Sequence, residues 1–152
     1  MASTPTRRTL RIPSETGHLA EVRSFVREAT GAFGATPGVT ADLVQAVDEA
    51  VCNVILHGRG PKPGRAGSDE IELSAELREG RVEIRILDRA AAFDPTSAAG
   101  PDLSMSPRER RPGGMGIHLM RSGTDALHHR PRPDGGNELL LVRRADGATE
   151  EG

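Results

Sequence analysis

Hydrophobic residues recur along this chain with two different periods, which separate helices from strands. Between about Glu15 and Phe33 they recur every three to four positions, which predicts an amphipathic helix. A second helix is predicted from Thr40, a candidate N-cap, to Gly58, a candidate C-terminal stop. Its apolar stripe consists of Leu43, Val44, Val47, Val51, Val54 and Ile55. Each helix therefore has one face suited to packing against a sheet.

A period of two predicts a β-hairpin in the middle of the chain. Apolar and polar residues alternate over 71–77 and again over 82–86, with Glu79-Gly80 as the turn between them. The other predicted elements are strands at 7–12, 125–130 and 138–143 and a short helix at about 116–122. This order, β-α-α-β-β-loop-α-β-β, predicts an α+β two-layer sandwich. In it, helices cover one face of a mixed, mostly antiparallel sheet.

The composition is that of a single globular domain. The chain has 152 residues, 28% charged and 36% hydrophobic, so we expect one domain at 1–152. Its core is predicted at about 8–143, with a flexible N-terminus at 1–6 and a flexible tail at 145–152. The net charge of −2 and the presence of only three aromatic residues, all Phe, argue against nucleic-acid binding. No apolar run could span a membrane and the start lacks a signal-peptide pattern, so we expect a cytoplasmic protein.

Three polar residues fall on one side of the second helix. Glu49, Asn53 and His57 are spaced four apart, so their side chains stack on one face. A carboxylate and a carboxamide one turn apart can act together, because the first accepts a proton and the second offers an oxygen to a hard cation. A solvated helix face is the ordinary interpretation of such a pattern, so residues elsewhere must decide.

Asp88 is the second candidate. Counting by twos along its strand places it on the same face as Val82, Ile84 and Ile86, which predicts a buried carboxylate. A buried carboxylate needs hydrogen-bond donors. These are either the backbone amides of a following turn or the amine of a ligand, and both interpretations stay open.

The third candidate is the glycine-rich segment that opens the short helix. In Gly113-Gly114-Met115-Gly116 the backbone can approach a ligand closely, and a helix N-terminus offers free N–H groups to an anion. A hinge is the competing interpretation. An arginine cluster just upstream, Arg108, Arg110 and Arg111, is either solvated or available to phosphates.

In this order and spacing, the segments resemble the sequence boxes of the Bergerat-fold (GHKL) ATPases, the superfamily of gyrase, Hsp90 and histidine kinases. Residues 49–58 resemble the N-box, 88–95 the first glycine box, 113–122 the second glycine box, and 135–139 the closing turn and last strand. The compact chain is most similar to the anti-sigma-factor serine kinases of bacterial partner-switching systems. The resemblance covers about residues 8–143.

The resemblance implies a role for each matching residue. Glu49 would be the catalytic base, Asn53 would bind Mg²⁺, and Asp88 would accept a hydrogen bond from the adenine amino group. The loop at 96–112 would be the ATP lid, and His57 would be structural. The remaining nucleotide-binding residues would be Arg111, Gly113, Gly114, Met115, Gly116, Ile117 and Asn137, the last standing where the family often has Thr.

The implied function is an anti-sigma factor that is also an ATP- and Mg²⁺-dependent serine/threonine kinase. Its substrate would be a STAS-type anti-sigma-factor antagonist. A sigma factor and a second copy of the chain are further partners that fit the resemblance. One departure motivates an alternative: Ala90 and Ala92 stand where the family has glycines. At positive φ, each Ala would cost about 1–2 kcal/mol. The alternative is a catalytically weak or inactive, nucleotide-binding or nucleotide-free scaffold that sequesters a partner.

Overall fold

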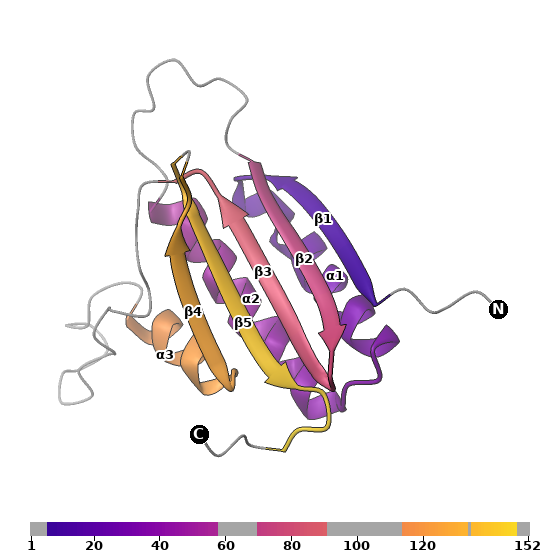
Figure 1. Ribbon diagram of the computed structural model, residues 1–152. Coiled ribbons are helices and arrows are strands. Elements are labelled where there is room, and N and C mark those ends of the chain that lie inside the picture. Colours follow the sequence, from indigo (N-terminus) through magenta and orange to yellow (C-terminus); the bar gives the residue numbers. More distant parts are fainter. Residues whose placement is uncertain (1–5, 58–69, 91–113, 134, 149–152) are drawn as a thin grey trace.

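The computed structural model describes residues 6–57, 70–90, 114–133 and 135–148, and the loops at 58–69 and 91–113 lie outside these ranges. The elements follow the predicted order (Figure 1). They are β1 (Arg7–Pro13), the 3₁₀ helix η1 (Thr16–His18), α1 (Leu19–Ala32), α2 (Pro37–His57), β2 (Glu70–Arg78), β3 (Arg81–Asp88), α3 (Gly114–Ser122), β4 (Ala126–Pro131) and β5 (Asn137–Arg144).

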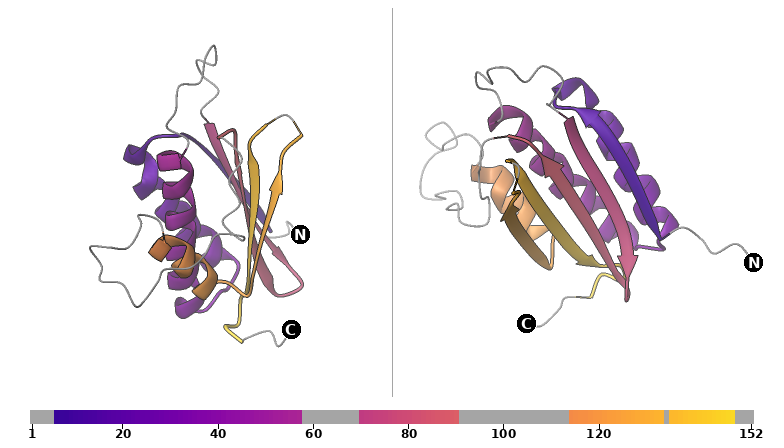
Figure 2. Two further views of the ribbon diagram at one scale, coloured as in Figure 1. Left: turned by 90° about the vertical axis from the view of Figure 1, so that its left-hand side faces the viewer. Right: turned by 45° about the horizontal axis from the view of Figure 1, so that its top comes forward.

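The five strands form one sheet in the order β1-β2-β3-β5-β4. A mixed sheet was expected, but all four strand pairs in the described part of the chain are antiparallel. All three α-helices lie on one face of this sheet, as the side view in Figure 2 shows. The predicted two-layer sandwich is therefore confirmed. The β3–β5 register sets Asp88 opposite Asn137, which joins two segments 49 residues apart.

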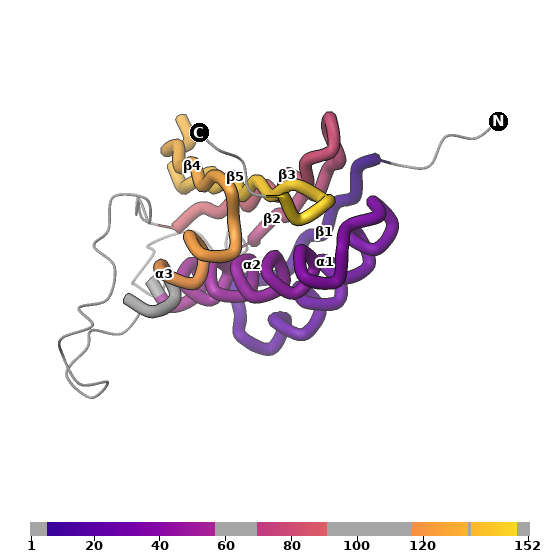
Figure 3. Tube along the Cα trace, turned by 90° about the horizontal axis from the view of Figure 1, so that it is seen from below, coloured from indigo at the N-terminus to yellow at the C-terminus, as the bar shows by residue number. Residues whose placement is uncertain are grey.

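The core lies between the sheet and the helices, with α2 as the central helix between α1 and α3 (Figure 3). The alternation in β2 and β3 sends every second side chain toward the helical layer, where all of them except Leu77 are buried. The buried stripe of α2 contains Leu43, Val47, Val51 and Ile55, while Val44 and Val54 are half-buried. No helix of the described residues is long and apolar enough to cross a membrane.

The start of α2 differs from the prediction. The helix begins at Pro37, and Thr36 caps it by accepting a hydrogen bond from the Val39 N–H at 3.2 Å. Thr40 is inside the first turn, and its hydroxyl donates to Thr30 Oγ1 of α1 at 2.9 Å. Thr40 therefore joins the two helices instead of capping one. A proline at the first helical position was the signal that the prediction missed.

Residues at both edges of the predicted core form backbone hydrogen bonds with the rest of the fold. The carbonyl of Thr6 accepts a hydrogen bond from Leu77 N–H at 2.9 Å, so it continues the pairing of β1 with β2. Ala145 donates to the Gly80 carbonyl at 2.9 Å and accepts from Thr36 N–H at 3.0 Å. Ala145 is therefore held by backbone hydrogen bonds, while residues 149–152 lie outside the described residues.

A partly buried ion-pair network fixes the C-terminal half of the sheet to the helical layer. Arg143 of β5 reaches Asp125 Oδ1 at 3.1 Å and Asp42 Oδ2, on α2, at 3.2 Å. The Asp125 side chain is only 4% exposed, and its second oxygen accepts the Arg144 backbone N–H at 2.7 Å. Asp125 directly precedes β4, so the network ties together α2, β5 and the segment that follows α3.

Replacing Asp125 with Ala should lower the free energy of unfolding by about 3 kcal/mol, because a buried guanidinium loses one of its partners. Chemical denaturation tests this. The matched control is Asp146→Ala, because Asp146 forms an exposed ion pair with the neighbouring Arg144 at 2.9 Å. The control should unfold close to the wild-type midpoint. Equal losses in both variants would contradict a special role for the buried network.

Candidate functional site

Glu49 and Asn53 lie on the side of α2 that faces α3 and β5. The turn holding Asp42 defines this side. The Asp42 side chain reaches Arg143 of β5. A Cβ placed on Gly123, just after α3, would lie 2.8 Å from the Asp42 carbonyl oxygen. Glu49 and Asn53 follow Asp42 by seven and eleven residues, which returns each to the same side of the helix. The predicted polar pair is therefore turned inward, toward the α3 layer.

Asn53 is buried, so a solvated helix face does not describe it. Its side chain is 8% exposed, and its Nδ2 has no hydrogen-bond partner among the described residues. Leaving a buried amide unpaired costs about 1–3 kcal/mol. Such a group calls for an explanation, and a ligand is one that fits its position. His57, the third member of the predicted face, has its side chain outside the described part.

Glu49 is half-buried, and its pKa is raised. Burial, which disfavours the charged form, is the main cause, and the negative charge of the adjacent Asp48 adds to it. Asp48 itself is held by Arg23 of α1 at 2.9 Å, so its carboxylate stays beside Glu49. A carboxylate with a raised pKa is better suited to accept a proton than an ordinary one. Burial also raises the pKa of the Cys52 thiol, which keeps it protonated.

The N-terminus of α3 reaches the level of these two residues. Gly123 ends α3 beside Asp42, and α3 runs back along α2 in the opposite direction (Figures 1 and 3). The nine residues of α3 rise by about 13 Å at 1.5 Å each. This distance along α2 leads from Asp42 to the turn between Glu49 and Asn53. The backbone of Gly114 and Gly116 thus begins the helix there, as predicted.

The structure describes only some of the other residues predicted in and around the glycine segment. Ile117 is buried at 6% exposure and, with Met120, fixes α3 to the core. The Met115 side chain is outside the described residues, as are Gly113 and the predicted arginines, Arg111 among them. Their roles therefore stay predictions.

Asp88 is 3% exposed, as the strand period predicted. Its Oδ1 accepts two hydrogen bonds, from Ala90 N–H at 2.8 Å and from Asn137 Nδ2 at 3.0 Å. Neither bond uses Oδ2. A cavity of about 10 Å³, room for one water molecule, lies between this carboxylate and Val54 of α2. The turn interpretation is therefore confirmed for Oδ1, while the ligand interpretation stays a prediction that concerns Oδ2.

The expected strain at Ala90 is absent. Among the described residues other than glycine, only Glu79 has a positive φ, of 49°, in the hairpin turn. Ala90 is buried at 7% exposure with ordinary backbone geometry. Replacement of a family glycine by Ala90 thus carries no left-handed penalty, while Ala92 lies outside the described residues.

Gly136 is a site-forming residue that sequence reasoning missed. It has a φ of 103°, and a Cβ there would lie 2.0 Å from the Asp88 carbonyl oxygen and 2.7 Å from Arg89 Cα. The backbone of the β4–β5 turn therefore lies directly against the end of β3. Arg132 completes the contact, because its Nη1 donates to the same Asp88 carbonyl at 2.9 Å. The Gly135-Gly136 pair indicated a turn, but no local signal indicated this close approach.

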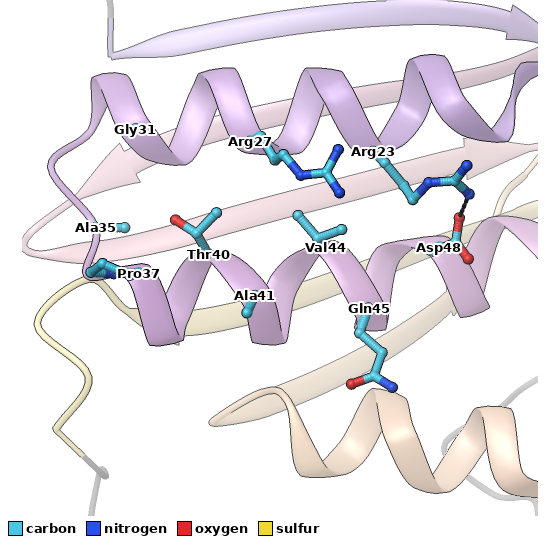
Figure 4. Close-up of a pocket in the computed structure, with 10 residues that line it drawn as sticks. All are labelled: Arg23, Arg27, Gly31, Ala35, Pro37, Thr40, Ala41, Val44, Gln45 and Asp48. Carbon is cyan, nitrogen blue, oxygen red and sulfur yellow. Dashed lines mark hydrogen bonds and ion pairs between the residues drawn. The ribbon is translucent and has the colours of Figure 1, made fainter.

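A larger groove of about 690 Å³ lies elsewhere, between α1 and α2 (Figure 4). Small and apolar residues such as Ala41 and Val44 line it, and the Arg23–Asp48 ion pair stands at one end. None of the predicted site residues lines this groove.

An α+β sandwich that holds these polar groups beside a glycine-initiated helix has the architecture of an ATPase domain. The chain belongs to the histidine kinase-like ATPase domain family, whose model matches residues 12–143. This confirms the predicted resemblance.

The chain is 38% identical to the serine/threonine-protein kinase BtrW of Bordetella bronchiseptica over 100 residues, covering 66% of this chain and 67% of that protein. It is 29% identical to the anti-sigma F factor of Clostridium beijerinckii over 129 residues, covering 82% and 87%. The solved RsbU and RsbW domains of a Mycobacterium tuberculosis protein superpose with a TM-score of 0.62 at 18% identity. That match covers 96% of this chain and 35% of the longer one, and it concerns the fold alone.

Substituting Gly136 with Ala should lower the free energy of unfolding by more than about 2 kcal/mol, because the new methyl group meets backbone as well as an unfavourable φ. The matched control is Gly135→Ala. Gly135 has a similar φ of 95° but nothing within 4 Å of an added Cβ. The control should lose only about 1 kcal/mol. Denaturation midpoints give both values, and equal losses would refute the close contact with β3.

The Glu49→Gln variant should be more stable than the wild type at neutral pH. A raised pKa means that the folded protein binds the Glu49 proton more tightly than the unfolded chain. The contribution of Glu49 to wild-type stability therefore falls as pH rises above about 4.5, the ordinary pKa of Glu. The gain of the variant should vanish below that pH. Thermal unfolding of both proteins from pH 4 to 8 tests this, with the exposed Glu28→Gln as control. A constant difference at every pH would contradict the assignment.

Proposed function

We propose that this protein is a serine/threonine kinase that uses Mg-ATP and also acts as an anti-sigma factor in a partner switch. The observation that carries the proposal is the unpartnered, buried Asn53 amide one turn from Glu49, on the side of α2 that faces the N-terminus of α3. The Nδ2 of this amide lacks an acceptor, which a phosphate oxygen would supply, while Oδ1 would be the oxygen offered to a metal ion. The raised pKa of Glu49 supports its role as the base.

Asp88 and α3 would bind the two ends of the nucleotide. The unused Oδ2 of Asp88 would accept a hydrogen bond from the adenine amino group. The N–H groups of Gly114 and Gly116 would donate to phosphate oxygens at the helix N-terminus. Gly113, Met115, Ile117 and Arg111 complete this proposed set, and the loop at 96–112 is its proposed lid.

The residues present fit Mg²⁺ better than a metal that needs a protein cage. In the described part of the chain, no group of three His, Cys, Asp or Glu side chains comes together. Mg²⁺ is commonly bound by one or two protein oxygens, with phosphates and waters filling the other positions. Asn53 Oδ1 is the proposed protein ligand. Bound Mg-ATP supplies the γ-phosphoryl group.

Glu49 would act on the acceptor hydroxyl. It would orient this hydroxyl toward the γ-phosphorus and accept its proton as the phosphoryl group transfers. Phosphoryl transfer needs little more than positioning and charge neutralisation, so one base, one metal ligand and the helix N-terminus can suffice. The neighbouring Asp48 and the partial burial of the site keep the proton affinity of Glu49 high.

The partners are proposed from the relatives. Proteins named anti-sigma F factor and serine/threonine-protein kinase are similar to most of this chain. We therefore assign it a STAS-type antagonist as phosphoacceptor, a sigma factor as its target, the cytoplasm as its location, and a homodimer as its assembly. The alternative of an inactive scaffold rested on Ala90 and Ala92, and the ordinary backbone of Ala90 removes half of that motivation.

Incubation with Mg-[γ-³²P]ATP and the antagonist encoded nearby tests the proposal. Wild-type protein should label a Ser or Thr of the antagonist. Glu49→Gln should label the antagonist about 100-fold or more slowly, because it lacks the general base. Asn53→Ala should lose activity, and the activity that remains should no longer depend on Mg²⁺. Glu28→Gln is the matched control on α1 and should be unchanged. Undiminished transfer by Glu49→Gln would refute the base, and failure of wild type to bind ATP would favour the scaffold.

A further inference from the structure

We infer that His129 is a positioning residue that selects adenine, acting through Asn137 on Asp88. The inference deepens the nucleotide site proposed above and rests on it. Neither His129 nor the orientation of the Asn137 amide follows from the sequence boxes that identified the site.

Three side chains form a continuous hydrogen-bonded line across three strands. His129 Nε2, on the edge strand β4, lies 2.8 Å from Asn137 Oδ1, on β5. Asn137 Nδ2 donates to Asp88 Oδ1, on β3, at 3.0 Å. The strand registers set His129 opposite the buried Leu139 and Asp88 opposite Asn137. All three side chains therefore point to the helix-covered face, where the proposed adenine site lies.

The direction of each hydrogen bond follows from chemistry. The carboxylate of Asp88 can only accept, and its Oδ1 already accepts from Ala90 N–H at 2.8 Å. Asn137 must therefore turn its NH₂ group toward Asp88 and its oxygen toward the histidine. An amide oxygen can only accept, so Nε2 of His129 must carry a proton. His129 therefore supplies the donor that matches this orientation of the Asn137 amide.

This orientation controls the chemistry that Asp88 offers to a base. With Oδ1 bound to two N–H donors, the carboxylate is held in one rotamer and Oδ2 is left as an acceptor. An acceptor favours the exocyclic amino group of adenine over the carbonyl oxygen that hypoxanthine has at the same position. Without His129 the Asn137 oxygen loses this donor, so the amide is held less firmly against Asp88 and the carboxylate is less restrained in that rotamer.

The affinities for ATP and for inosine triphosphate, measured by calorimetry, test the inference. His129→Ala should weaken the affinity for ATP about tenfold, equivalent to about 1.4 kcal/mol. It should weaken the affinity for inosine triphosphate less than about twofold, since the lost hydrogen bond serves the amino group of adenine. His129→Gln should recover much of the ATP affinity, because its side-chain NH₂ can replace Nε2–H. The matched control is His128→Ala. His128 is exposed and pairs with Leu140 on the opposite face of the sheet, so neither affinity should change.

Equal loss of affinity for both nucleotides in His129→Ala, or no loss for either, would overturn the inference. A second measurement needs no nucleotide: long-range ¹H–¹⁵N NMR of the free protein should find His129 protonated at Nε2. A His129 with an unprotonated Nε2 would overturn the hydrogen-bonded line. Wild-type protein that binds neither nucleotide would instead contradict the proposed function, while the NMR measurement would still decide the bond.

Discussion

The geometry of the site depends on the close contact between the backbone of Gly136 and the end of β3. That contact lets β5 pair with β3 up to Asp88, where it sets Asn137 directly opposite the carboxylate. The Arg132 side chain donates a hydrogen bond to the backbone carbonyl of Asp88. The end of β3 is thus held through its backbone, and the Asp88 side chain is left for another purpose. A methyl group at residue 136 would move all of these groups at once.

A stable core usually pairs every buried polar group, and this one departs from that rule at particular places. The Nδ2 of Asn53 has no partner in the part of the chain that the structure describes, and Glu49 is partly desolvated beside another carboxylate. Both features oppose folding. The ion-pair network of Arg143 with Asp42 and Asp125 binds the same helix to β5, about two to three turns earlier along α2. The unfavourable free energy of these two residues, at the candidate-site end of α2, is therefore offset in part by ion pairs at the other end of the same helix.

Sequence periodicity predicted the elements and the layer arrangement because each depends on residues within one turn or one strand. The buried Asp88 and the paired Glu49 and Asn53 could be found in the same way. The predicted start of α2 was wrong because Thr36 and Thr40 are both acceptable caps and the proline that follows Thr36 was not taken into account.

The His129–Asn137–Asp88 line and the Gly136 contact could not be predicted because they depend on strand register across more than 40 residues. Gly136 had the appearance of an ordinary turn residue, and His129 that of an ordinary histidine in an edge strand. Long-range register is set by the whole core, so no local pattern reveals which residue of one strand meets the end of another.

Ala90 illustrates why a departure from a family pattern must be judged by local geometry. The glycine that it replaces is permissive at any φ, but a permissive residue is needed only where φ is positive. Here the Asp88 side chain accepts the Ala90 N–H and closes the turn with ordinary backbone angles. An alanine in such a position restricts the unfolded chain more than a glycine would, which favours the folded state. The substitution at residue 90 is therefore compatible with a well-ordered Asp88, and it gives no reason to regard the site as degenerate.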